Sequence, residues 1–182
     1  MKLGFFQITA AAAALLLLLA LTGCQKSFEL RSMAFRNNEP IPEKYWHSLD
    51  KSDISLPLNW VNTPAGTQSF ALIMHHPHGP TKTISWAVFN IPADCNEISE
   101  GASDENMPMG SVELYNHYRQ LGYHGPAPLR GGGIYEWTIE LYALNTGGLN
   151  EPSEFKPIED LYAILEGKVI GKAVLVGTAS RK

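Results

Sequence analysis

The stretch that decides the fold is Ser69-Phe-Ala-Leu-Ile-Met-His-His-Pro-His-Gly-Pro-Thr-Lys-Thr-Ile-Ser-Trp-Ala-Val-Phe-Asn-Ile-Pro92. Its two flanks, residues 69–74 and 83–91, are rich in β-branched and aromatic residues, a composition typical of buried strands. Between them lies His75-His-Pro-His-Gly-Pro80, whose prolines and glycine should interrupt both runs. The pattern predicts two central strands that flank a rigid turn carrying three histidines.

Outside this stretch, further strands are indicated. Residues 28–33 alternate apolar with polar side chains, the period of a half-buried strand. Residues 134–144 carry the strongest strand signal of the chain, and residues 168–178 form a valine-rich final strand. Residues 36–68 read as a long polar loop around one short strand near residues 56–60. Residues 122–133 hold five glycines and two prolines, which predicts a loop of fixed, unusual backbone geometry.

One short amphipathic helix is expected near the C-terminus. Apolar residues recur there at i, i+3, i+4 and i+7, namely Ile158, Leu161, Tyr162 and Leu165. Ser153 is a candidate cap, Pro157 falls in the first turn and Gly167 follows the end. The chain is therefore predicted to be mostly β, at the border of the all-β and α+β classes, with a short C-terminal helix.

The N-terminal residues 1–23 have the layout of a secretory signal. Lys2 precedes an apolar run that is short for a membrane span of about 20 residues and ends at Leu21-Thr-Gly-Cys24. That tetrapeptide resembles a bacterial lipobox, which implies cleavage before Cys24 and its lipidation. We therefore expect residues 24–27 to be a lipidated tether and residues 28–182 to be one domain. A plain signal peptide with an incidental cysteine is the alternative.

The same resemblance predicts a location in the bacterial cell envelope. Gln25, in place of an aspartate after the cysteine, favours the outer membrane, with the protein facing the periplasm. The membrane would then be a partner through the acyl chains on Cys24.

Composition and motifs exclude several function classes. Without residues 1–23 the chain keeps 13 basic against 18 acidic side chains, a net charge of −5, which argues against nucleic acid as a partner. Only two cysteines occur, Cys24 and Cys95, too few for a disulfide framework or a cysteine-rich zinc module. The sequence has no nucleophile elbow, phosphate-binding loop or zinc-protease helix. We expect a protein that is not an enzyme and needs no cofactor.

Four segments, in order, resemble the phosphatidylethanolamine-binding protein family, in particular its bacterial Raf-kinase-inhibitor-like branch. They are Asp53 to Trp60, His75 to Pro92, Gly122 to Pro128 and Tyr135 to Leu144. The resemblance covers most of residues 28–178. It implies an antiparallel β-sandwich with a helix near the C-terminus. It also implies a small anion pocket where the turn after Met74 meets the loop Gly122 to Pro128.

The chain departs from the family pattern at the pocket. His76-Pro-His-Gly-Pro80 stands where the family has Asp-Pro-Asp-Ala-Pro, and Ser85 replaces a pocket histidine. Tyr135-Glu-Trp137 replaces His-Arg-Tyr, and the family element Asn-Asp-Phe-Gly reads Asn116-His-Tyr-Arg119. The resemblance thus implies that the scaffold persists while the chemistry of the site has changed.

The leading hypothesis is non-catalytic, pH-dependent binding of a small anion of the phosphate or lipid-headgroup type. Imidazoles donate hydrogen bonds and become cationic near a pKa of about 6.5, and a glycine beside prolines can present its N–H to an oxyanion. The expected binding residues are His76, His78, Ser85, Gly125 and Tyr135.

Two other functions remain open. A metal site for zinc, copper or nickel could draw on His75, His76, His78 and His124, with His117 as a further candidate. The second of these functions is that of an envelope protein-interaction or protease-inhibitor module with a degenerate pocket. For that module, Tyr45-Trp-His47 stands in a polar loop, where the aromatic pair is either an exposed contact for a partner protein or a lid folded over the core.

Overall fold

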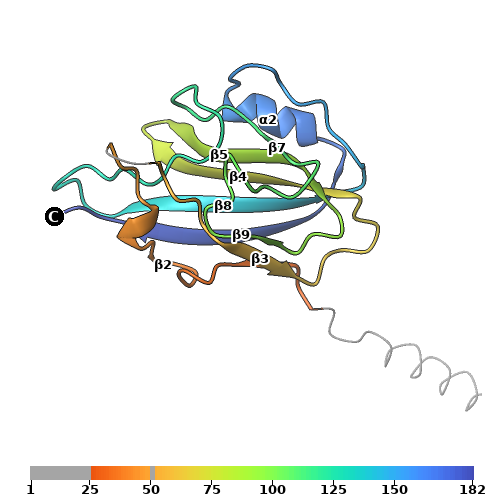
Figure 1. Ribbon diagram of the computed structural model, residues 1–182, viewed down its shortest axis with the longest axis horizontal. Helices are drawn as coiled ribbons and strands as arrows, with labels where there is room; N and C mark the ends of the chain where they lie inside the picture. The colour runs from red at the N-terminus through yellow and green to blue at the C-terminus, as the bar shows by residue number, and fades with distance from the viewer. Residues whose placement is uncertain (1–25, 50–51) are drawn as a thin grey trace, which may run out of the picture.

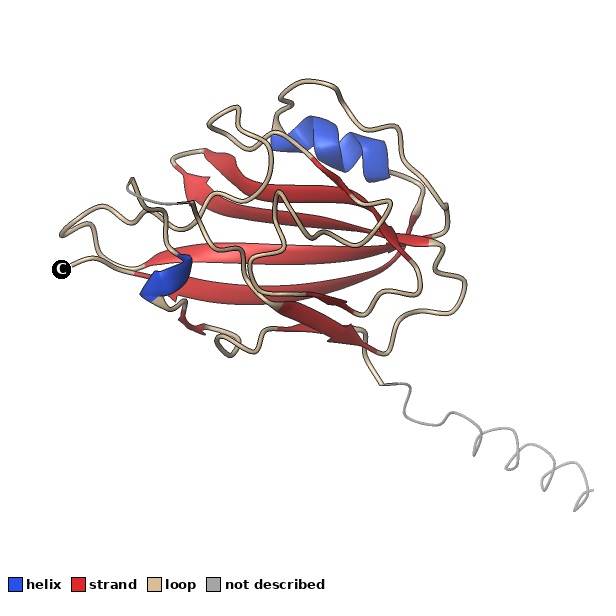
Figure 2. Cartoon of the chain, in the orientation of Figure 1, coloured by secondary structure: helices blue, strands red, loops and turns tan. Residues whose placement is uncertain are grey.

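The computed structural model describes residues 26–49 and 52–182, which form two stacked sheets and one α-helix (Figures 1 and 2). The large sheet has the strand order β2-β9-β8-β4-β5-β7 and the small sheet the order β1-β3-β6. All paired strands are antiparallel except β2 and β9. The strands are β1 (Glu29–Arg31), β2 (Glu39–Pro40), β3 (Leu58–Val61), β4 (Ser69–His78), β5 (Thr81–Pro92), β6 (Glu97–Ile98), β7 (Val112–Glu113), β8 (Tyr135–Leu144) and β9 (Val169–Ala179). The helices are a 3-10 turn η1 (Glu43–Tyr45) and α2 (Ile158–Leu165). The predicted fold class is confirmed.

Both faces of the large sheet are covered at its central strands, so these strands read as continuous apolar runs. Along β4, Phe70, Leu72 and Met74 pack toward the small sheet, in a core that includes Trp60, Trp86 and Trp137. The alternate residues Ala71 and Ile73 pack toward α2, against Ile158, Leu161 and Leu165. Neighbouring residues of β4 therefore face different layers of the protein, and this alternation places the histidines that follow.

The histidine segment does not interrupt the two central strands, contrary to the sequence prediction. Pairing continues to the end of the hairpin, with His76 opposite Thr83 and His78 opposite Thr81, so only Gly79 and Pro80 turn. Pro77 is tolerated because β4 pairs with β8 only as far as His75, which leaves the last residues of β4 with a free edge. The histidines therefore lie on a paired strand, which has one register shift against β5 between Met74 and His75.

The helix is confirmed, although its start differs from the prediction. Ile158, Leu161 and Leu165 are buried as expected, and Gly167 follows the helix at φ 74°. The N-cap is Pro157, without a side-chain cap, so the prediction that Ser153 caps the helix is wrong. A proline fits this position because it has no N–H to leave unpaired.

The sheet carries a buried carboxylate on its helix-covered face. Glu140 Oε2 accepts hydrogen bonds from the hydroxyls of Tyr142 and Tyr162 at 2.7 and 2.8 Å, and Oε1 accepts one from Lys172 Nζ at 2.8 Å. His75 Nε2 lies 3.6 Å from Oε2. These donors hold the pKa of Glu140 well below its ordinary value against the opposing effect of burial. Because Tyr162 belongs to α2, the carboxylate also fastens the helix to the sheet.

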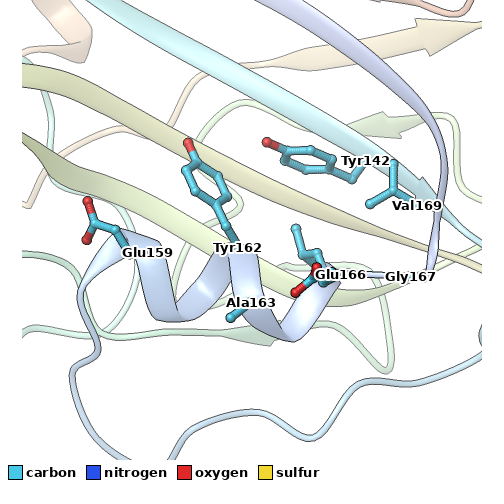
Figure 3. A pocket seen from close by; sticks show the side chains of 8 residues that line it. Tyr142, Glu159, Tyr162, Ala163, Glu166, Gly167 and Val169 are labelled. Carbon is cyan, nitrogen blue, oxygen red and sulfur yellow. The ribbon is translucent and has the colours of Figure 1, made fainter.

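Beside α2 lies an open groove of about 510 Å³, lined by Tyr142, Tyr162 and Val169 among others (Figure 3). None of the binding or metal-ligating residues proposed from the sequence lines this groove.

The start of the described chain lies at the end of the sandwich where β4 begins. The rings of Phe28 and Phe70 are 6.1 Å apart, and β4 then runs away from them toward His78. The predicted signal sequence, residues 1–23, and Cys24 lie outside the described residues. Within residues 26–49 and 52–182, no helix is long and apolar enough to cross a membrane.

Candidate functional site

The histidine hairpin, residues 75–85, and the Gly-Pro loop, Gly122 to Pro128, meet at Ser85. The backbone N–H of His124 donates to the carbonyl oxygen of Ser85 at 2.8 Å. On the same residue, Oγ lies 3.4 Å from Nδ1 of His76. Two segments that are nearly 40 residues apart in sequence are thus neighbours, as the hypothesis of a shared site requires.

His76 is a neutral hydrogen-bonding group at pH 7. Its ring packs 5.0 Å from that of Trp137. Burial, and to a smaller extent the nearby imidazoles of His78, His117, His75 and His124, lower the pKa of His76 to about 4. The expectation that this imidazole becomes cationic near its ordinary pKa is therefore wrong. His78, at the tip of the hairpin, is exposed.

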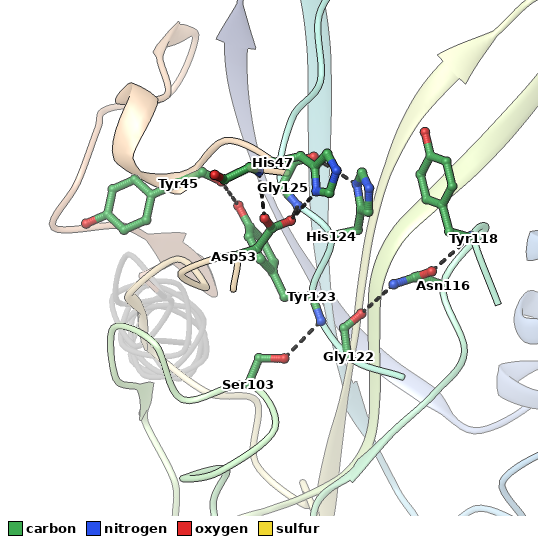
Figure 4. Close-up of polar contacts among 11 residues, drawn as sticks. Tyr45, His47, Asp53, Ser103, Asn116, Tyr118, Gly122, Tyr123, His124 and Gly125 are labelled. Carbon is green, nitrogen blue, oxygen red and sulfur yellow. Dashed lines mark hydrogen bonds and ion pairs between the residues drawn. The ribbon is translucent and has the colours of Figure 1, made fainter. Parts of the chain in front are cut away.

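A third segment, residues 43–49, covers the Gly-Pro loop and is fixed to it through Asp53 (Figure 4). Asp53 Oδ2 accepts the N–H of Gly125 at 2.8 Å and lies 3.1 Å from His47 Nδ1. The other oxygen, Oδ1, accepts the N–H of Ser48 at 2.9 Å, and the His47 N–H donates to the carbonyl of Pro126. A Cβ at Gly125 would overlap the Tyr45 carbonyl oxygen, so the close approach requires glycine.

This arrangement corrects the role expected for Gly125. Its N–H donates to Asp53 and is not available to an oxyanion while that bond is made. Gly125 instead sets the distance between the Gly-Pro loop and segment 43–49.

His124 lies at the centre of a stack of three rings. The ring centroids of His47 and Tyr118 are each 4.1 Å from that of His124, with interplanar angles of 19° and 21°. Nδ1 of His124 lies 3.0 Å from the Gly125 carbonyl oxygen. Burial lowers the pKa of His124, and the neighbouring His47 adds to this. Like His76, His124 is neutral at pH 7.

The four histidines proposed as metal ligands do not form one site. His75 points to the helix-covered face of the sheet, is only 4% exposed and lies beside Glu140. Adjacent residues of a strand point to opposite faces, so His75 cannot join His76. His117 is exposed, and its ring contacts those of Tyr118 and Phe155.

A different set of potential ligands converges in the described part of the chain. One donor atom each from His47, Asp53 and His124 lies within 4.8 Å of the other two. His47 and Asp53 were not among the predicted ligands, although Asp53 opens one of the segments that carry the family resemblance. The sequence feature that could have indicated Asp53 as a site residue is its carboxylate at the start of that segment.

Two aromatic residues border the histidines. Tyr135 is half-buried, with its ring 6.4 Å from that of Trp137. Trp46 is only 9% exposed, packs in the core and donates from Nε1 to the Ile41 carbonyl at 2.9 Å. Arg181 lies over its ring, 5.8 Å from the centroid. Of the two readings of Trp46, the lid over the core is correct and the exposed partner contact is wrong.

Comparisons with known proteins agree with this architecture. Residues 31–180 match the family model described as phosphatidylethanolamine-binding protein. A UPF0098 protein of Methanothermobacter thermautotrophicus is 38% identical over 154 residues, which span 84% of this chain and 98% of that protein. The UPF0098 protein YbhB of Escherichia coli is 31% identical over 124 residues, 64% of this chain and 78% of that protein.

Solved structures share the fold. The crystal structure of Escherichia coli YbcL, described as a member of the mammalian PEBP family, superposes with a TM-score of 0.79 at 24% identity, over 86% of this chain and all of YbcL. The homologue CT736 of Chlamydia trachomatis gives a TM-score of 0.71 at 26% identity, over 86% of this chain and 99% of CT736.

Proposed function

The chain belongs to the phosphatidylethanolamine-binding protein family, and from this premise we propose that it is a lipid-anchored, non-catalytic binding protein for a small anion. The anion is a phosphate group, free or as part of a headgroup, held beside Ser85. The observation that carries the proposal is the junction at Ser85, where the histidine hairpin and the Gly-Pro loop bring His76 and His124 to one serine.

The hydrogen-bonding groups at the junction suit such a ligand. Ser85 offers a hydroxyl, and the neutral imidazole of His76 offers one N–H. Ser85 is buried and Trp137 packs against the ring of His76, and little water at these donors strengthens their hydrogen bonds.

Binding should tighten as the pH falls. An anion beside His76 favours its protonated form, so binding takes up a proton and raises a pKa that stands at about 4 in the free protein. The groups around His76 are His78 of its own strand, His117 and His124 of the neighbouring segment, Ser85 of β5 and Trp137 of β8, and His75 acts on it from the other face of the sheet. None of these groups is a carboxylate that would oppose the anion.

The binding experiment is a calorimetric titration of the full chain with inorganic phosphate, glycerol phosphate and anionic phospholipid vesicles, from about pH 5.5 to 8. Ser85→Ala should weaken binding of every phosphate that binds, because it removes a donor hydroxyl. Thr81→Ala is the matched control, since Thr81 also bears a hydroxyl on β5 but lies at the exposed hairpin tip. Saturable binding of inorganic phosphate or glycerol phosphate, but not of vesicles, identifies a free phosphate as the ligand. Saturable binding of vesicles alone identifies a lipid headgroup. No saturable binding, or equal binding by Ser85→Ala, refutes the proposal.

The anchor is tested separately. Cys24→Ala should release the protein from envelope membranes and remove the acyl mass from the N-terminal peptide. An unchanged membrane fraction in this variant contradicts lipidation at Cys24. The supporting observation is the sequence Leu21-Thr-Gly-Cys24 at the end of the apolar run.

The alternative of a protein-interaction or protease-inhibitor module loses its main support. It was suggested by an exposed aromatic pair, and both Tyr45 and Trp46 are buried.

A further inference from the structure

The part of the site around Asp53 and His124 carries negative rather than positive charge. Asp53 has a side chain only 8% exposed, and in the described part of the chain no lysine or arginine pairs with it or lies against His124. Around it lie the imidazoles of His47, whose Nδ1 is 3.1 Å from Oδ2, and of His124, whose ring stacks on that of His47. Imidazole nitrogens beside a carboxylate are a donor set that a divalent transition metal ion prefers.

We propose that His47, Asp53 and His124 bind one divalent transition metal ion of the zinc type. Their donor atoms lie within 4.8 Å of one another. Ligands that share a zinc ion at about 2.0–2.2 Å each are about 3–4 Å apart, so a small closure of this triangle forms the site. The proposal rests on these three residues and is independent of the anion at Ser85.

Two of the three ligands are already oriented by second contacts. The N–H groups of Gly125 and Ser48 fix both oxygens of Asp53. Nδ1 of His124 faces the Gly125 carbonyl oxygen at 3.0 Å, so Nδ1 carries the hydrogen and the lone pair is on Nε2. A backbone carbonyl or carboxylate behind a histidine is the usual support of a metal ligand.

The third ligand must move. A metal ion lies in the plane of each imidazole that binds it, and the rings of His47 and His124 are stacked with an angle of only 19° between their planes. His47 is the ring free to turn, because its side chain is 30% exposed and sits on the covering segment 43–49. Metal binding therefore breaks the stack of His47 on His124 while Tyr118 stays in place.

A bound metal ion would also supply positive charge to the anion site, which has none from lysine or arginine among the residues described around it. Three protein ligands leave a zinc ion an open position for water or an anion. His124, one of the ligands, is joined through its backbone to Ser85. A bound divalent charge would therefore strengthen phosphate binding at the junction.

The test uses the full chain purified without a polyhistidine tag and stripped with EDTA. Zinc is titrated by calorimetry, and cobalt is followed by the visible absorption of a tetrahedral complex. We expect one ion per chain, with affinity reduced at least about tenfold in His47→Ala and in His124→Ala. The controls His78→Ala and His117→Ala remove exposed histidines and should change affinity less than twofold. A thermal melt of each stripped variant confirms that it is folded.

The outcomes separate the proposals. No stoichiometric metal, or equal losses in the control variants, overturns the metal site. Retained affinity in a folded His47→Ala variant also overturns it, because this ring must supply a ligand. Glycerol phosphate is then titrated with and without zinc. Tighter binding with zinc supports the coupling, and unchanged binding refutes the coupling. Phosphate binding in a protein that takes up no metal overturns the metal site and leaves the proposed function standing.

Discussion

Replacing Asp53 with asparagine tests how segment 43–49 is held on the Gly-Pro loop. The carboxylate accepts the N–H of Gly125 and pairs with His47 on Oδ2, and it accepts the N–H of Ser48 on Oδ1. An amide has only one acceptor oxygen, so its NH₂ group must face at least one of these donors. The substitution keeps the size of the side chain and removes the charge together with one acceptor.

The expected loss of stability follows from these contacts. A buried N–H left without its partner costs about 1–3 kcal/mol, and hydrogen bonds to the remaining neutral oxygen are about half as strong as those to a carboxylate. Asp53→Asn should therefore lower the free energy of unfolding by about 2–4 kcal/mol, undiminished by solvent because the side chain is only 8% exposed.

Urea unfolding in EDTA, followed by tryptophan fluorescence, measures this change. The matched control is Asp94→Asn, an exposed aspartate that makes no hydrogen bond in the described part of the chain, which should change stability by less than about 0.5 kcal/mol. Hydrogen exchange should show faster exchange at the amides of Gly125 and Ser48 in Asp53→Asn. A loss below about 1 kcal/mol, with both amides still protected, would refute the argument that Asp53 holds the segment.

Three further predictions concern strain, the buried carboxylate and pH. Arg119 has φ 59°, a left-handed conformation that costs a non-glycine residue about 1–2 kcal/mol. Arg119→Gly and Arg119→Ala both lose the contact with Phe155, so they differ only in this backbone strain. Arg119→Gly should therefore be about 1 kcal/mol more stable than Arg119→Ala in urea unfolding, and equal stability of the two variants would contradict the strain. Glu140→Gln should cost about 2–3 kcal/mol in the same assay, since one of its donors, Lys172 or the hydroxyls, then faces an amide NH₂; a variant as stable as the parent would show that the network contributes nothing. His76 has a pKa of about 4 when folded and about 6.5 when unfolded, so its contribution is complete above pH 6.5 and is lost as the pH falls through 4. After discounting for the partial exposure of His76, its contribution to the free energy of unfolding is about 1 kcal/mol. In His76→Gln the free energy of unfolding should therefore fall less between pH 6.5 and 4 than in the parent protein. An unchanged pH profile would contradict the lowered pKa.

The sequence predicted the central strands β4, β5 and β8 of the large sheet because most of their side chains are buried on both faces, whereas it missed the two-residue strands β2 and β7. Runs such as Ser69 to Met74 have no other stable environment than the interior of a layered protein. It failed at His75 to Pro80, where proline and glycine argued for a loop. The free edge of β4 beyond His75 accommodates Pro77, and a free edge depends on where β8 ends, which local sequence does not reveal.

The candidate site was predicted in part for the same reason. The meeting of the histidine hairpin with the Gly-Pro loop followed from the family resemblance, and the contacts of Ser85 agree with it. The role of Gly125 could not be foreseen, because its N–H donates to a carboxylate more than 70 residues away in the sequence. His75 and His76 were both considered as ligands of one metal ion. Once both are placed on a strand, their side chains must point to opposite faces of the sheet, which excludes a shared site.

The length of β4 has a consequence for how such a protein would meet its ligand. The strand begins beside Phe28 and ends at His78, and ten residues of extended chain span about 30 Å. A molecule tied to a bilayer by acyl chains on Cys24 would stand on its Phe28 pole, with the histidines at the opposite pole. Its cargo would then arrive from the surrounding water, and a phospholipid could be captured only after some other factor had lifted it out of its leaflet.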